Sequence, residues 1–266
     1  MINKTARKGF SGIILFIAYF LIYFPILVIA LLSFNDSSFI YEFKGLSLSH
    51  YLNILDNKMM VESISRTLQI AVASTLIATV AGTLIAIGIN SMKKKIRIRV
   101  MMINNIPVIN PDIVTGISLM IVFNFLSIRF DGTTMLLAHV FFSIPFVVLT
   151  VLPRLKELDP NLFEAALDLG CNYFQGIYKV ILPSIKSGII AGALIAFTMS
   201  VDDFIISYFT SGHGYTNFSI WLYSAIQRNI FPPEAFAYNT LLMVVAIGVI
   251  GYMNLGKKRV KRRSEK

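Results

Sequence analysis

Two consecutive aspartates, Asp202 and Asp203, interrupt an apolar stretch at residues 187–209 of this 266-residue chain. The stretch itself contains no lysine or arginine that could neutralise them. A carboxylate at the centre of a membrane helix costs about 2.5–3.5 kcal/mol on insertion scales, so two in succession need a compensating role. We expect them to face a wet cavity or a cation. The alternative is that one of them caps a broken helix or bonds to a hydroxyl of a neighbouring helix. Because successive helical residues differ by about 100°, the two are not expected to line one path together.

A third carboxylate, Asp112, follows an Asn-Pro pair at the start of another apolar segment. An acidic residue in this position can cap the helix and complement its dipole, and it is equally suited to contact a cation. Tyr208 and Trp221 lie at or beyond the carboxyl end of residues 187–209. Their rings can stack on an ammonium group, although an interfacial aromatic belt predicts the same residues. The candidate cation path therefore consists of Asp112, Asp202, Asp203, Tyr208 and Trp221.

A second signature lies between two apolar segments, at residues 159–183, which we call the Glu-Ala-Ala loop. Its marker residues are Glu164, Ala165, Ala166, Gly170, Leu182 and Pro183. Asp159-Pro160 supplies a helix N-cap and a first-turn proline, and Gly170 can end that helix in the left-handed conformation. Pro183 marks the start of the next membrane helix. The pattern predicts a short helix, a turn and a second helix.

One face of the first short helix is predicted to be apolar. Leu162, Ala166 and Leu169 recur at helical spacing, so a stripe faces something at the membrane surface. A small amphipathic helix of this kind usually needs a groove to lie in. The loop is therefore a candidate docking element.

Residues for covalent or metal chemistry do not form a pattern in this sequence. Cys171 is the only cysteine, and the three histidines, His50, His139 and His213, are far apart and are expected to be solvated or packing residues. The phosphate-binding pattern GxxxxGK[ST] does not occur. A membrane enzyme would need a nucleophile-base pair, a metal cluster or a cofactor fingerprint. If transport is driven by ATP, another chain must bind the ATP.

The elements that position these residues are membrane helices. Hydrophobic residues make up 56% of the chain, charged residues only 14%, and the mean hydropathy is +0.71, which excludes a soluble domain of this size. A helix needs about 20 mostly apolar residues to cross a bilayer. The predicted fold class is all-α, a polytopic membrane protein with six transmembrane helices at residues 10–34, 67–90, 107–128, 133–152, 187–209 and 236–255.

The basic residues predict the orientation of these helices. They gather in the amino terminus, after the second helix, around the Glu-Ala-Ala loop and in the carboxyl-terminal tail. Only Lys44, Lys58, Arg66, Arg129 and Arg228 fall on the other side. The positive-inside rule therefore places both termini and the loop in the cytoplasm. Topology also explains the net charge of +10 without a nucleic-acid partner, and the first apolar segment is too long for a cleaved signal peptide.

The predicted organisation has three parts. Residues 1–62 hold the amino terminus, the first helix and an external segment, residues 63–256 form the transport core, and residues 257–266 are a basic cytoplasmic tail. Small residues recur every four positions on two core helices, namely Ser74, Ala78, Gly82, Ala86 and Asn90, and Gly188, Gly192, Ala196 and Ser200. Such ridges let helix backbones approach closely. Whether they join helices of this chain or contact a second subunit stays open at this point.

The Glu-Ala-Ala loop resembles the segment by which ABC-importer permeases dock onto their ATP-hydrolysing partner. Glu164, Ala165, Ala166, Gly170, Leu182 and Pro183 match the family's motif, and Val180 is a conservative departure from the usual isoleucine. Together with residues 110–114 and 197–203, the loop is similar to the permeases of spermidine/putrescine importers, along nearly the whole chain.

The resemblance implies a type I ABC-importer permease core in a bacterial inner membrane. It implies a second permease subunit, a dimeric cytosolic ATPase that uses ATP and magnesium, an extracytoplasmic substrate-binding protein and the surrounding membrane lipid as partners. No cofactor is implied for this chain itself. A polyamine, which is a flexible chain of protonated amines, is the implied substrate.

Two other functions remain open from the residues. The chain can be an ABC permease for another substrate, such as iron, thiamine or an anion, although intramembrane aspartates without a basic partner disfavour the anion. It can also be a stand-alone secondary transporter, in which Asp112 or Asp202 binds a coupling proton. The Glu-Ala-Ala loop argues against the second possibility.

Overall fold

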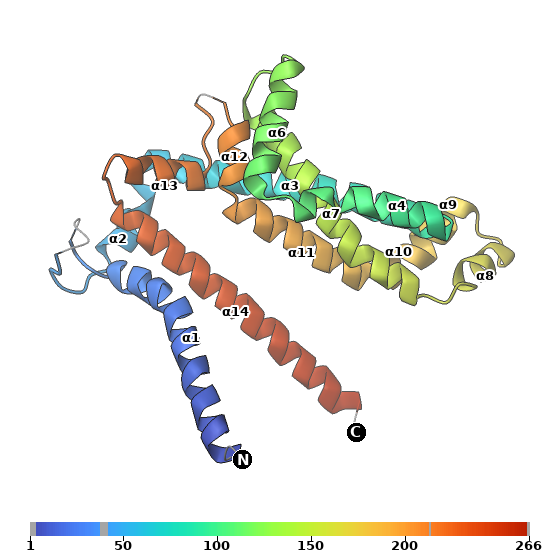
Figure 1. Ribbon diagram of the computed structural model, residues 1–266, viewed down its shortest axis with the longest axis horizontal. Coiled ribbons are helices and arrows are strands. Elements are labelled where there is room, and N and C mark those ends of the chain that lie inside the picture. Colours follow the sequence, from blue (N-terminus) through green and yellow to red (C-terminus); the bar gives the residue numbers. More distant parts are fainter. Residues whose placement is uncertain (1–3, 38–41, 213, 265–266) are drawn as a thin grey trace. The chain divides into compact units, whose positions relative to one another are not determined.

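The computed structural model describes residues 4–37, 42–212 and 214–264 (Figure 1). These residues are helical, with one isolated β-bridge between Asn35 and Leu46. In chain order the elements are α1 (Lys4–Leu32), α2 (Ser49–Leu52), η1 (Asn53–Leu55), α3 (Lys58–Ser91), α4 (Lys94–Asn104), α5 (Ile106–Ile109), α6 (Asp112–Phe125), α7 (Gly132–Glu157), α8 (Leu162–Asp168), α9 (Tyr173–Gly176), η2 (Ile177–Ile181), α10 (Leu182–Ser184), α11 (Lys186–Asp202), α12 (Ile205–Thr210), α13 (Phe218–Gln227) and α14 (Pro233–Ser264).

The chain forms two compact units, each with its own contacts. One comprises Met1–Val61 and Leu222–Lys266, and the other comprises Glu62–Trp221. The second unit contains every candidate site residue. The predicted division at residues 62 and 256 concerns the extent of the transport core, which compactness does not test, so it stays a prediction.

Several helices are long and apolar enough to cross a membrane. Within the described residues these are Gly12–Leu32, Lys58–Asn90 and Gly132–Glu157. A fourth span arises if Tyr173–Ser184 and Lys186–Asp202, which meet at an angle of 72°, are taken together. Asp112–Phe125 and Pro233–Gly248 are shorter apolar helices. An all-helical protein with several spans is therefore confirmed, and the number six stays a prediction.

Two predicted spans are not continuous helices. Residues 107–128 divide into α5 and α6, because Asn110 precedes a proline and takes an extended conformation with ψ of 139°. Residues 187–209 divide into α11 and α12, because Asp203 is extended with φ of −64° and ψ of 129°. The second break occurs within the aspartate pair and decides what each carboxylate does.

The core of the second unit is built around α7. Val147, Val148 and Val151 of this helix are fully buried and form one cluster with Ala86 of α3 and Ala196 of α11. α11 packs along α7, and α12 packs against both α6 and α7 (Figure 1). The helices that carry the aspartates are therefore held by a common central helix.

The small-residue ridges make these contacts possible within the chain. Ser74, Ala78, Ala86, Gly188, Gly192, Ala196 and Ser200 are all buried. A Cβ atom on Gly192 would lie 3.2 Å from the Cα atom of Val147, and one on Gly188 would lie 2.7 Å from Cγ of Arg154. For Gly188 and Gly192 the question left open by the sequence is answered, because both contact α7 of the same chain. Ser74 instead contacts Ser200 of α11.

Replacing Gly82 with alanine is expected to destabilise the protein by about 1–3 kcal/mol, the usual cost of overpacking a tight core. The added Cβ would meet Cβ of Val147 at 2.7 Å and the carbonyl oxygen of Ile144 at 3.2 Å, and neither can move freely. Thermal unfolding of the purified protein in detergent measures the effect. Gly88→Ala on the same helix is the matched control, because a Cβ there meets nothing within 4 Å. Equal melting temperatures for the two variants would contradict the packing.

Candidate functional site

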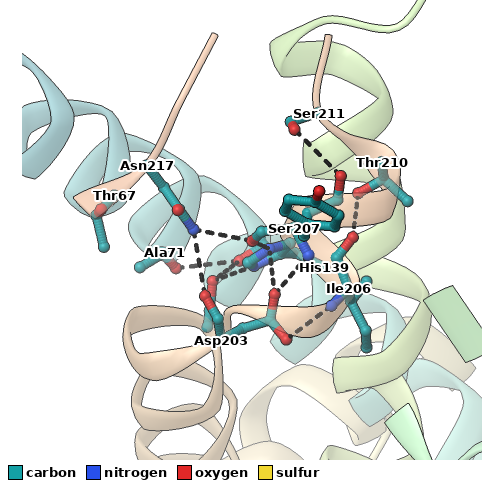
Figure 2. A network of polar contacts seen from close by, with 12 residues as sticks. Thr67, Ala71, His139, Asp203, Ile206, Ser207, Thr210, Ser211 and Asn217 are labelled. Carbon is teal, nitrogen blue, oxygen red and sulfur yellow. Dashed lines mark hydrogen bonds and ion pairs between the residues drawn. The ribbon is translucent and has the colours of Figure 1, made fainter. Parts of the chain in front are cut away.

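The break between α11 and α12 is stabilised by the side chain of Asp203 (Figure 2). Its Oδ2 atom accepts a hydrogen bond from the backbone N–H of Ser207 at 2.7 Å, and Oδ1 accepts one from the N–H of Ile206 at 3.3 Å. The carboxylate thus satisfies the first turn of α12, as an N-cap does. Only 8% of the side chain is exposed. Of the two alternatives for this residue, the geometry favours the cap.

A buried polar network surrounds the cap. The Nδ1 atom of His139 is hydrogen-bonded to Oγ of Ser200 at 2.6 Å, and Nε2 is bonded to Oγ of Ser207 at 2.9 Å and lies 3.5 Å from Oδ2 of Asp203. Asn217 donates from Nδ2 to the carbonyl oxygen of Asp203 at 3.2 Å and to Oγ of Ser207 at 2.9 Å. Figure 2 shows His139, Asp203, Ser207 and Asn217 converging on the break. Because the network is buried, each of its bonds is costly to lose.

The network extends to the second predicted span. Oγ of Ser200 is 3.1 Å from Oγ of Ser74 on α3, and either hydroxyl can donate. The backbone N–H of Phe218 donates to Oγ of Thr67, also on α3, at 2.9 Å. Thr134 of α7 donates to the carbonyl oxygen of Thr210 at the end of α12, at 2.9 Å. Polar contacts therefore join α3, α7, α11 and α12 around one point.

Asp202 and Asp112 have a different environment from Asp203. Both are exposed. Asp112 is the first residue of α6, after Pro111 at the N-cap position, so its charge lies in the first turn, where it complements the helix dipole. It lies near enough to both Asp202 and Asp203 for its charge to interact with theirs. The break therefore separates the two consecutive aspartates into one residue with a buried side chain, Asp203, and one exposed residue, Asp202.

The two aromatic candidates are placed differently from the carboxylates. Tyr208 is half exposed and packs against Phe204 and Phe209, with ring centroids 5.5 and 5.6 Å apart. It lines an open cavity of about 890 Å³ between α6 and α12 that also contains Arg129, whose charge disfavours a cation. Trp221 stacks on Phe218 at 5.8 Å.

The Glu-Ala-Ala loop folds as a helix, a turn and a second helix, as predicted. Gly170 has φ of +90°, the left-handed region that favours glycine, and α8 ends just before it. The regular helix begins at Leu162 rather than at Pro160, although Oδ1 of Asp159 accepts from the N–H of Asn161 at 2.9 Å. After the turn, α9, η2 and α10 form the second helix, and the chain bends by 72° around Ile185. The second helix includes a π-helical turn at Ile177–Ile181, which the sequence did not indicate.

The apolar face of the loop differs from the predicted stripe. Ala166 is buried and Leu162 is partly buried, because α8 packs on the second helix through Phe163, whose ring meets Tyr173 edge-on at 5.2 Å. Of the three stripe residues Leu169 is exposed (87%), and Phe174 (81%) and Tyr178 (73%) of the second helix are exposed beside it. Glu164 and Ala165 are also exposed. The loop therefore supports its own fold internally and presents an acidic residue and several apolar side chains.

Sequence reasoning missed the residues that organise the break. His139 was expected to be a solvated or packing residue, yet it is 1% exposed and both of its ring nitrogens are bonded. Asn217 and Ser207 were not singled out. The available signal was a histidine inside an apolar span, where polar side chains usually have a partner on another helix.

Comparisons with known proteins bear directly on this arrangement. Residues 78–257 match the family described as "Binding-protein-dependent transport system inner membrane component". The chain is 32% identical over 250 residues to "Spermidine/putrescine transport system permease protein PotC" of Escherichia coli (strain K12), covering 94% of this chain and 93% of that protein. It is 31% identical over 264 residues to "Putrescine transport system permease protein PotI" of the same strain, covering 94% and 90%.

Solved structures show the same fold. A chain of a bacterial ABC transporter involved in the import of the acidic polysaccharide alginate superposes with a TM-score of 0.71 at 17% identity, covering 96% of each chain. A chain of an amino acid ABC transporter crystallised with histidines superposes with a TM-score of 0.55 at 16% identity, covering 79% of this chain and 98% of that one. At these identities the likeness concerns the fold alone.

Proposed function

Because this chain belongs to the binding-protein-dependent transport system inner membrane components, and is thus a multi-pass permease of an ABC importer rather than an ATPase, we propose that its substrate is a polyamine such as spermidine or putrescine. The observation that carries the proposal is the exposed pair Asp112 and Asp202, which are the first residue of α6 and the last residue of α11. Two carboxylates at the ends of otherwise apolar helices are suited to a chain of protonated amines separated by methylene groups. The two polyamine permeases at 31–32% identity support the same substrate class.

The consecutive aspartates Asp202 and Asp203 have different roles in this proposal. Asp202 contacts the passing cation together with Asp112, whereas Asp203 holds α12 in place. Tyr208 and Trp221 are at most walls of the path, and the positive charge of Arg129 keeps the cavity beside Tyr208 from being the main cation site. The substrate contacts thus come mainly from the exposed ends of α6 and α11.

The Glu-Ala-Ala loop couples transport to ATP hydrolysis in this proposal. Glu164, Ala165, Ala166, Gly170, Leu182 and Pro183 form or shape the element that docks into a groove of a dimeric cytosolic ATPase, with Leu169 and Phe174 as apolar anchors. Closure of the ATPase dimer moves this helix as a rigid body, and the path then opens to one side or the other. A second permease subunit completes the path, and an extracytoplasmic binding protein delivers the substrate. The distribution of basic residues supports an orientation with both termini in the cytoplasm.

The test is ATP-dependent uptake into proteoliposomes that contain the complete complex. Labelled spermidine and putrescine are expected to accumulate and to compete with each other. Thiamine, ferric iron and monovalent ammonium compounds are expected neither to accumulate nor to compete at equal concentration. Uptake of one of these instead of polyamines would overturn the substrate assignment, while the family assignment would stand. Accumulation that persists without ATP under a proton gradient would revive a secondary transporter.

A further inference from the structure

His139 contacts both sides of the break with one side chain. Through Nδ1 it holds Ser200, which lies in the last turn of α11, and through Nε2 it holds Ser207, in the first turn of α12 (Figure 2). Asn217 holds only the α12 side and the Asp203 carbonyl. The imidazole is therefore a brace from α7 across the two halves of a broken helix.

We propose that His139 is a positioning residue for transport, which braces the break so that Asp202 stays presented to the substrate path. The role of Asp202 in substrate contact rests on the function proposed above. The effect of His139 on the orientation of Asp202 does not depend on that function. Ser200 is two residues before Asp202, and Asp203 directly follows it. Because the network fixes Ser200 on one side and Asp203 on the other, the orientation of Asp202 is set by bonds that it does not itself make.

The brace lies at the end of α11 that is far from the Glu-Ala-Ala loop, so α11 connects the loop to the break. α11 has 17 residues and is therefore about 25 Å long. At its other end it follows the 72° bend after the Glu-Ala-Ala loop. A movement of that loop reaches the break through a rigid helix, and the brace determines how α12 and Asp202 respond. A packing role alone would require a side chain of this volume but not two hydrogen bonds directed at opposite sides of the break.

The geometric test uses a single cysteine as a reporter. In the assembled complex, with Cys171 replaced by serine, Asp202→Cys is labelled with a membrane-impermeant, positively charged methanethiosulfonate reagent. Ser200→Ala removes the bond to Nδ1 of His139 together with the contact to Ser74, and Ser207→Ala removes the bond to Nε2 together with the one from Asn217, each with little change of volume. Each is expected to change the labelling rate at position 202 by about 3–10-fold, as the loss of the hydrogen bond to His139 would. His139→Leu should produce a larger change than either.

Two controls separate bracing from general loosening. Ser143→Ala lies on α7 one turn from His139, and the hydroxyl it removes is buried without a hydrogen-bond partner. It should leave the rate at position 202 unchanged. A second reporter, Leu194→Cys, lies on α11 two turns before the break and is exposed, and its rate should not respond to the serine variants. Unchanged labelling at position 202 in both serine variants, or an equal change in Ser143→Ala, would overturn the proposal.

A transport arm completes the test with Asp202 and Cys171 intact. Ser200→Ala is expected to raise the KM for uptake while the complex assembles normally and its maximal rate changes less. His139→Gln, which can still bond in two directions, should recover a KM closer to that of the parent than His139→Leu does. If the labelling changes but KM does not, the brace stands and the substrate role of Asp202 fails. If His139→Leu does not assemble, the two serine variants decide the outcome.

Discussion

Glu164→Lys is expected to abolish ATP-dependent uptake and to weaken association with the ATPase by about 100-fold, since like charges brought together at an interface cost several kcal/mol. Glu164 is exposed in the first turn of α8. An acidic side chain there also complements the positive end of the helix, which a lysine would oppose. The change therefore affects docking more than folding. Co-purification of the tagged ATPase with the permease measures it.

Asp168→Lys is the matched control for this prediction. It makes the same change of charge on the same helix, but in the last turn, where a cation suits the helix dipole. Association and uptake are expected to fall by less than about 3-fold, the usual range for a surface substitution. If both variants lose the ATPase equally, the loop responds only to net charge and the specific role of Glu164 is wrong.

Leu169→Ala and Phe174→Ala extend the same reasoning to the exposed apolar side chains. Phe174 was identified only from the structure, whereas Leu169 was already part of the predicted stripe with Leu162 and Ala166. Helical spacing could show that α8 has an apolar face, but it could not show that the second half of the loop would cover part of that face. Phe163 and Tyr173 make that contact, and they are ten residues apart across the turn.

The local turns of the loop were predictable because single residues decide them. Gly170 adopts the positive φ that only glycine tolerates easily, and Pro183 precedes the bend. The small-residue ridges were predictable for a similar reason, since close helix packing leaves no room for larger side chains. Their partner was not predictable, because the spacing of Gly188 and Gly192 does not indicate which helix packs against them.

The break in α11 was the hardest feature to anticipate. Residues 187–209 are apolar and contain no proline, so hydropathy favours one uninterrupted helix. The break forms because Asp203 satisfies the backbone of α12 and because His139 and Asn217, which are 64 and 14 residues away along the chain, reach the same point. Such a network depends on tertiary structure. The sequence could indicate that the aspartates needed partners, but it could not assign the partners or separate their roles.

The division of roles within the pair leads to the second large effect. Asp202→Asn is expected to raise the KM for polyamine uptake by about 10–100-fold, since a hydrogen bond to a charged group contributes about 1.5–3 kcal/mol. The side chain is exposed, so the stability of the complex should change by no more than about 0.5 kcal/mol, as for most surface substitutions, and its melting temperature should hardly change. Asp112→Asn should behave in the same way. The double variant should cost less than the sum of the two, because the carboxylates act on one ligand.

Asp203→Asn is expected to give the opposite result. One of its two accepting oxygens becomes an NH₂ group, which faces either the N–H of Ser207 or that of Ile206. A buried donor left without an acceptor costs about 1–3 kcal/mol, so the variant should melt at a lower temperature. Complexes that do assemble should retain a KM nearer to the parent than Asp202→Asn does. A KM defect for Asp203→Asn as large as that for Asp202→Asn, without loss of stability, would show that the buried carboxylate contacts the substrate in a state more open than the one described here.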